Sequence, residues 1–181
     1  TTIATIIAFL EHLGHFPGQI QLPEKSKLER RELVLPISEG NRLIDGAPND
    51  RLRFVFFCGF HAGLRKGEIM HSRPSWFQFE RGILRVPRVD ELGENLFQVK
   101  DSEMREIPLT ADFIKFLKKF LKGVPADSYC LTNPAKRSSK TGAYDFLRPF
   151  KKYAAEAGVP ELYPHAMRHS WITELCNSGN H

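Results

Sequence analysis

The sequence predicts an α+β fold that is mainly helical, with helices around a small three-stranded antiparallel sheet. Two observations lead to this prediction. Several stretches repeat apolar residues at the spacing of one helix face. Between them, WFQFERGILRVP alternates apolar and polar residues as a strand does. With 181 residues, the chain is long enough for one full domain with a hydrophobic core.

The first third of the chain is predicted to be helical on both sides of a linker. Residues 1–14 are expected to form an amphipathic helix, and residues 16–36, rich in Pro, Glu, Lys and Arg, a linker. ISEGNRLIDGA and NDRLRFVFFCGFHAG then predict one short amphipathic helix and one strongly apolar helix. Polar caps and a glycine stop delimit these two helices: Ser38, Asn49 or Asp50, and Gly63.

In the middle of the chain, apolar and polar residues alternate with the period of β-strands. WFQFERGILRVP predicts a β-hairpin around its Glu-Arg-Gly turn, and NLFQVK and MREIPL predict short strands after it. The small antiparallel sheet is therefore expected within residues 76–109.

The last third returns to helices. Thr110 is expected to cap a helix whose apolar side carries Phe113, Phe116, Leu117, Phe120 and Leu121. A second helix is predicted over residues 141–157, stopped by Gly158 and Pro160, and a third from Pro164 to Gly179.

The charge of the chain is basic and uneven. The net charge is +5, and residues 113–155 hold ten Lys and Arg against two Asp. Such density favours a polyanion partner through counterion release, although a solvated lysine-rich surface fits the charge equally well. Three separated cysteines without a CxxC pair favour free thiols and a reduced, cytoplasmic setting. No apolar run is long enough to cross a membrane.

Three short stretches carry side chains suited to phosphate chemistry. In GLRKGE, Glu68 lies on the helical face of Arg65 and can brace its guanidinium. Lys100 lies in a predicted turn between strands. In HAMRH, His165, Arg168 and His169 share one helix face. Taken singly, GLRKGE is better explained by a surface ion pair and Lys100 by an ordinary lysine in a turn. HAMRH taken singly is as well explained by structural histidines at a helix start.

A metal site is a weaker interpretation of HAMRH. Ala166 stands where a zinc protease needs glutamate, and the cationic Arg168 opposes a dication. We therefore expect no metal.

Taken together, AGLRKGE, the turn lysine followed by RxIPLT, and HAMRHSWITEL resemble the catalytic domain of the tyrosine recombinase (phage integrase) family. The likeness spans residues 37–181 and implies the fold of DNA breaking-rejoining enzymes. It also implies that a tyrosine attacks a DNA phosphate, giving a 3′-phosphotyrosyl link and a free 5′-hydroxyl. No cofactor, metal or small-molecule substrate is implied.

The resemblance also implies a role for each residue. Arg65 and Arg168 would hold the phosphate oxygens, Lys100 would protonate the leaving oxygen, and His165 would assist proton transfer. Glu68 and His169 would support them. The resemblance implies a bacterial or phage-derived protein that binds double-stranded DNA as a tetramer. The DNA backbone would be contacted by six basic residues: Lys136, Arg137, Lys140, Arg148, Lys151 and Lys152.

The sequence departs from the family at two places. All four tyrosines precede Arg168, so no nucleophile is assigned, and these 181 residues alone are expected to bind DNA without cleaving it. Residues 1–36 are expected to be a helix and linker left from a preceding core-binding domain. Two alternatives remain: a non-catalytic DNA-binding protein with this fold, and an enzyme similar to type IB topoisomerases.

Overall fold

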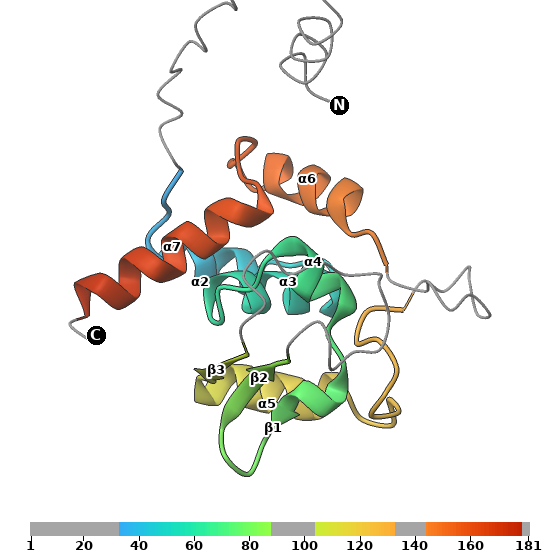
Figure 1. Ribbon diagram of the computed structural model, residues 1–181. Coiled ribbons are helices and arrows are strands. Elements are labelled where there is room, and N and C mark those ends of the chain that lie inside the picture. Colours follow the sequence, from blue (N-terminus) through green and yellow to red (C-terminus); the bar gives the residue numbers. More distant parts are fainter. Residues whose placement is uncertain (1–32, 88–103, 133–143, 179–181) are drawn as a thin grey trace, which may run out of the picture. The chain divides into compact units, whose positions relative to one another are not determined.

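The computed structural model describes residues 33–87, 104–132 and 144–178 (Figure 1), all within the compact unit Glu32–His181. The predicted helix at 1–14, most of the linker and the predicted strand at 95–100 lie outside the described residues. The described elements are α2 (Ile37–Asp45), α3 (Asp50–Phe60), α4 (Lys66–His71), the 3₁₀ turn η1 (Pro74–Trp76), β1 (Phe77–Gln78), β2 (Ile83–Val86), β3 (Arg105–Pro108), α5 (Ala111–Phe120), α6 (Leu147–Glu156) and α7 (Pro164–Asn177). The predicted fold class is confirmed. None of the described helices is long and apolar enough to cross a membrane.

Helix α3 is the centre of the core. It begins where predicted, because the Asn49 side chain accepts a hydrogen bond from Leu52 N at 3.0 Å. From Phe54 to Phe60 every residue is buried. In Figure 1, α6 and α7 lie above α3, and the sheet and α5 lie below it. A helix that is apolar on all sides therefore fits a position with neighbours on all sides.

Aromatic stacking joins α3 to helices on two sides. The ring of Phe57 stacks on Phe113 of α5 with centroids 4.9 Å apart. The ring of Phe56 stacks on Phe150 of α6 with centroids 5.2 Å apart. Such pairs contribute about 0.5–1.5 kcal/mol beyond the burial of their area. These contacts fix α5 and α6 relative to the end of α3 that leads into α4.

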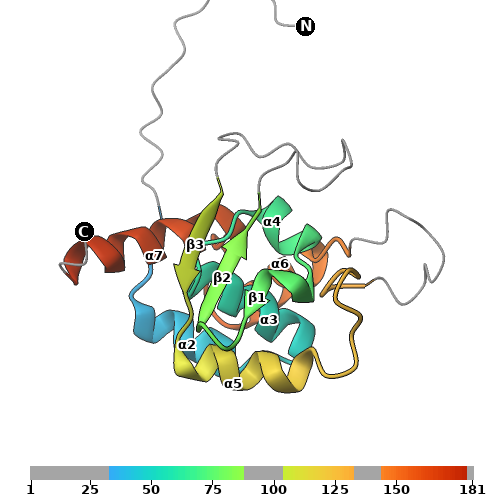
Figure 2. The ribbon, with the colours of Figure 1, turned by 60° about the horizontal axis from the view of Figure 1, so that its bottom comes forward.

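The sheet has the strand order β1-β2-β3, and both pairs are antiparallel (Figure 2). Gly82, with φ +63°, lies in the tight turn between β1 and β2. Along β2 the buried residues are Leu84 and Val86, and Leu84 pairs with the buried Ile107 of β3. This register also pairs Val86 with Arg105, which places Arg105 at the first position of β3.

Two predicted helix starts are wrong. Ser38 does not cap α2, because the carbonyl of Pro36 already accepts the first helical hydrogen bonds, from Glu39 N and Gly40 N. The helix predicted over 141–157 begins only at Leu147, since Tyr144 N donates to Leu131 O and holds the preceding chain elsewhere. Asp145 accepts a hydrogen bond from Leu147 N at 3.1 Å at this start.

Other predicted helix limits agree with the structure. The Thr110 side chain accepts from Phe113 N and caps α5. Gly158, with φ +83°, follows the end of α6, and α7 starts at Pro164. Helix α7 ends at Asn177, slightly before the predicted Gly179. Just before α2, Leu35 N donates to the Ser170 hydroxyl of α7 at 2.8 Å, which ties the described end of the linker to this unit.

Candidate active site

The site is built around the turn that follows α3. Gly63 adopts φ +57°, a left-handed conformation that favours glycine. Its N–H bonds to Gly59 O at 3.2 Å, and Leu64 N bonds to Cys58 O at 2.9 Å, which closes the helix end. A Cβ on Gly63 would lie 2.2 Å from Cε3 of Trp171. Only glycine therefore lets α7 pack this closely on the turn.

Close packing of α7 brings Arg168 to the same turn. One helix turn before Trp171, Arg168 Nη1 donates to the carbonyl of Gly63 at 2.5 Å. Met167 packs on Gly59, where an added Cβ would lie 2.5 Å from its Cε. Since Gly63 precedes Arg65 by two residues, their Cα atoms are at most about 7 Å apart. The guanidinium of Arg168 thus lies beside the start of α4.

Arg65 and Glu68 form the first turn of α4. The Glu68 carboxylate accepts from Arg65 N at 2.7 Å, as in a capping box. Its Oε1 also lies 3.5 Å from Arg65 Nη1, so the predicted brace between these two side chains is present. Glu68 is 0% exposed, whereas Arg65 keeps 28% of its side-chain surface exposed.

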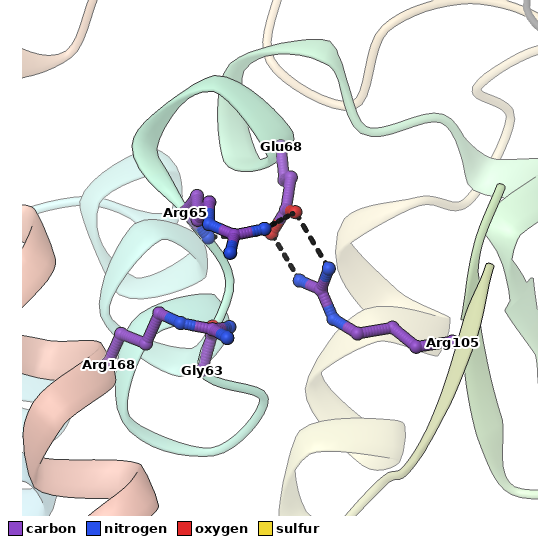
Figure 3. A network of polar contacts seen from close by, with 5 residues as sticks. All are labelled: Gly63, Arg65, Glu68, Arg105 and Arg168. Carbon is purple, nitrogen blue, oxygen red and sulfur yellow. Dashed lines mark hydrogen bonds and ion pairs between the residues drawn. The ribbon is translucent and has the colours of Figure 1, made fainter. Parts of the chain in front are cut away.

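A second arginine reaches Glu68 from the sheet. Arg105 Nη1 donates to Glu68 Oε1 at 2.9 Å, and Arg105 Nη2 donates to Glu68 Oε2. Figure 3 shows the side chains of Arg65, Arg105 and Arg168 approaching this corner from α4, β3 and α7. The result is that three guanidinium groups and one buried carboxylate meet at one turn.

The two histidines of HAMRH lie in the first turns of α7. His165 is exposed and His169 partly buried, with ring centroids 4.5 Å apart. Within the residues that the structure describes, no group of three His, Cys, Asp or Glu side chains is placed to hold a metal ion.

The cysteines are free thiols, with Cys176 exposed and the other two buried. Burial raises the pKa of Cys130 to about 12 and raises that of Cys58 as well. These two thiols are therefore unreactive packing residues near neutral pH.

The other predicted site residues are either outside the described residues or on α6. Lys100, Lys136, Arg137 and Lys140 lie outside the described residues. The three described members of the predicted DNA-binding set are exposed on α6: Arg148, Lys151 and Lys152. Of these, Lys152 lies 3.8 Å from Glu156.

Arg105 is the residue that sequence reasoning missed. It is the arginine of the RxIPLT stretch, which was quoted as part of the resemblance without a role for that residue. The available signal was its position at the start of a strand that pairs with a predicted hairpin. Its contact with Glu68 spans 37 positions and depends on the strand register, which the sequence pattern does not give.

Solved structures with the same fold are recombinases and integrases. The XerA recombinase structure gives a TM-score of 0.64 at 18% identity and covers 99% of this chain and 61% of its own. An integrase of the transposon Tn1549, solved in complex with transposon right end DNA, gives 0.63 at 18% identity, covering 98% and 64%. At this level of identity the comparison establishes the fold of tyrosine recombinase catalytic domains.

The phage integrase family matches residues 34–181, so this chain belongs to the phage integrase (tyrosine recombinase) family. The tyrosine recombinase XerA of Thermococcus onnurineus is 26% identical, covering 96% of this chain and 61% of its own. The XerC-like tyrosine recombinase of Caldanaerobacter subterraneus is also 26% identical, covering 87% and 46%. The chain thus spans about half to three fifths of the length of these relatives.

Proposed function

We propose that this chain is the catalytic domain of a site-specific DNA recombinase that cuts and rejoins strands through a 3′-phosphotyrosyl intermediate. One observation carries the proposal. Arg65 and Arg168, 103 positions apart (168 minus 65), lie at the same turn. Membership of the phage integrase family supports it.

The two arginines are suited to a phosphodiester. A guanidinium presents a planar fork of donors that matches two phosphate oxygens. Two such groups stabilise the extra negative charge of a pentacoordinate phosphorus, and here they are held in place before DNA arrives. Glu68 orients Arg65 through the backbone and side-chain contacts described above.

The remaining roles complete the proposed reaction. His165, exposed at the start of the helix that carries Arg168, assists proton transfer or binds the phosphate. His169 supports it through the contact between their rings. Lys100 protonates the leaving 5′-oxygen, while a tyrosine forms the covalent bond to the 3′-phosphate. The reaction needs no metal or nucleotide, because the covalent link conserves the bond energy.

No tyrosine of this sequence is proposed as the nucleophile. All four precede Arg168. Tyr153 donates from its hydroxyl to Leu43 O at 3.0 Å, and burial raises its pKa. We therefore propose that these 181 residues by themselves bind DNA without cleaving it.

Double-stranded DNA is the proposed partner, with assembly as a tetramer on it and a cytoplasmic location. The exposed cations of α6, together with Lys136, Arg137 and Lys140, are proposed to contact the DNA backbone. The presence of DNA in the solved complex of the Tn1549 integrase supports this partner.

Binding of this chain to a short DNA duplex, measured over a salt series, tests the proposal. Arg168→Ala is expected to weaken binding at least about tenfold at low salt, because a charge-assisted contact to a phosphate is lost. The slope of log affinity against log salt is expected to fall by about 0.9. The same reactions on a denaturing gel are expected to show no covalent protein–DNA adduct.

Arg81→Ala is the matched control. This arginine is 58% exposed, pairs with Glu106 and lies on the hairpin turn away from the cluster. The Arg81→Ala substitution removes the same charge as Arg168→Ala. It is expected to leave both the affinity for the duplex and the slope of log affinity against log salt unchanged. Equal losses in both variants, with thermal unfolding showing that both are folded, would contradict a phosphate site at Arg168.

A further inference from the structure

Arg73, two positions beyond the end of α4, is a cation that no carboxylate of the described residues neutralises. Its Cζ lies over the ring of Tyr129, 5.5 Å from the centroid. None of the ion pairs between described residues includes Arg73. Its Nε is buried and has no hydrogen-bond acceptor, although the residue as a whole is partly exposed. Because an unsatisfied buried donor on a charged group lowers stability, packing alone does not explain this arginine.

The tyrosine ring under Arg73 is held in place. His71 contacts the ring of Tyr129 edge-on, with ring centroids 5.7 Å apart. In Figures 1 and 2, residues 124–131 lie beside the chain that leads from α4 to β1. Two backbone hydrogen bonds join these segments: Cys130 N to Ser72 O at 2.8 Å and Ser75 N to Ala126 O at 3.1 Å. The position of the cation over the ring is therefore set by the fold.

Arg73 lies within reach of a duplex bound at the guanidinium cluster. It follows Arg65 by eight positions (73 minus 65), and most of that interval is α4. With a rise of about 1.5 Å per helical residue and about 3.8 Å for each other step, the two Cα atoms are at most about 20 Å apart. B-form DNA covers about 20 Å in roughly six base pairs. One duplex can therefore contact both arginines.

We propose that Arg73, placed over Tyr129, binds a phosphate of the DNA backbone a few base pairs from the phosphate held by Arg65 and Arg168. This inference rests on the proposed function. The terminal nitrogens of Arg73 donate to the phosphate oxygens, and the ring of Tyr129 keeps the cation in position before DNA binds. Such a contact fixes the register of the protein on the duplex without reading its sequence.

Binding of the 181-residue chain to a short DNA duplex, measured over a salt series, tests this contact. Arg73→Met is expected to weaken binding about tenfold at low salt and to lower the slope of log affinity against log salt by about 0.9. Arg73→Lys keeps the charge without the planar fork, so it is expected to keep the slope and part of the affinity. Tyr129→Leu removes the ring and is expected to weaken binding about threefold.

Arg51→Met is the matched control. Arg51 is also partly buried, and its Cζ lies 5.7 Å from the ring centroid of Tyr144. It likewise belongs to none of the ion pairs between described residues. It occupies the second position of α3, about 14 Å of helix from the end that leads to the site. Arg51→Met is therefore expected to bind the duplex as the parent chain does.

Thermal unfolding separates a binding role of Arg73 from a structural one. Because its Nε makes no hydrogen bond, Arg73→Met is not expected to lower the unfolding temperature. A loss of affinity accompanied by a clear loss of stability would assign Arg73 a structural role and overturn the inference. A salt slope that falls as far in Arg73→Lys as in Arg73→Met would overturn it too, since lysine keeps the charge.

The remaining outcomes distinguish this inference from the proposed function. If Arg168→Ala weakens binding while Arg73→Met binds as the parent chain does, the inference is wrong and the phosphate site stands. If Arg73→Met and Arg51→Met lose equal affinity, binding follows total charge and the inference is also wrong. If Arg168→Ala itself has no effect, the proposed function fails and the inference falls with it.

Discussion

At the scale of single residues, the site depends on a glycine as much as on its charged groups. Gly63 turns the chain at the end of α3, offers its carbonyl to Arg168 and leaves room for the ring of Trp171. The turn and the packing of Trp171 require glycine, because they use a left-handed backbone and the absence of a Cβ. Arg168 is therefore placed by the packing of its neighbours as well as by its own side chain.

Replacing Gly63 by alanine is expected to destabilise the fold by about 2–5 kcal/mol. About 1–2 kcal/mol comes from a left-handed alanine, and about 1–3 kcal/mol from displacing Trp171. Gly158→Ala is the matched control, since its φ is +83° but nothing lies within 4 Å of the added Cβ. Gly158→Ala is expected to lower the free energy of unfolding only by the about 1–2 kcal/mol of a left-handed alanine. Urea unfolding measures both variants, and an equal loss in the two would show that contact with Trp171 is not limiting.

At the scale of elements, the helix ends show what the sequence could and could not predict. Asn49 and Thr110 cap α3 and α5 as predicted, because capping is a local interaction over three residues. The start of α6 was mispredicted because Tyr144 bonds to Leu131, thirteen positions away. Ser38 was mispredicted as a cap because the carbonyl that accepts the first helical hydrogen bonds belongs to Pro36, two residues earlier.

The same difference between local contacts and contacts between distant residues applies to the site. Arg65 and Glu68 are three positions apart, so their contact follows from helical spacing. The proximity of Arg168 to this pair was implied by the family resemblance and not by spacing. Arg105 joins the pair through the register between β2 and β3, which depends on the folded sheet. Local contacts were therefore predictable from residues alone, and contacts between elements were not.

Alanine substitutions at Asn49, which caps α3, and at Ser38, which was predicted to cap α2 but does not, compare a correct cap prediction with an incorrect one. Asn49→Ala is expected to lower the free energy of unfolding by about 1 kcal/mol, because Leu52 N loses its acceptor. Ser38→Ala is expected to change it by no more than about 0.5 kcal/mol, because Ser38 lies inside α2 and makes no cap bond. Chemical denaturation of both variants checks this, and a larger cost for Ser38 would reverse our assignment of the helix start.

At the scale of the whole molecule, the described residues carry positive charge in three distinct places. The guanidinium cluster of Arg65, Arg105 and Arg168 comes from α4, β3 and α7 (Figure 3). The exposed cations Arg148, Lys151 and Lys152 lie on a separate helix, α6. Helix α5 carries a third group of exposed lysines on the other side of α3, below it in Figure 1. Net charge alone therefore does not say which face meets DNA.

Two triple variants compare these helices at equal change in charge. Alanine at Arg148, Lys151 and Lys152 is expected to lower the salt slope of duplex binding by up to about 2.7, or about 0.9 for each lost phosphate contact. Alanine at Lys115, Lys118 and Lys119 of α5, which are also exposed, is expected to change it much less. Equal slopes for the two variants would mean that binding follows total charge and that α6 is not a DNA-facing helix.

The guanidinium cluster also forms only when the last described helix has folded onto the rest of the unit. Its members come from α4, β3 and α7, and Arg168 reaches the turn only after α7 has docked on α3. A half-folded chain holds each of these side chains but does not bring them together. Under the proposed function, a chain in which α7 has not docked therefore lacks the pair of arginines that would hold the phosphate.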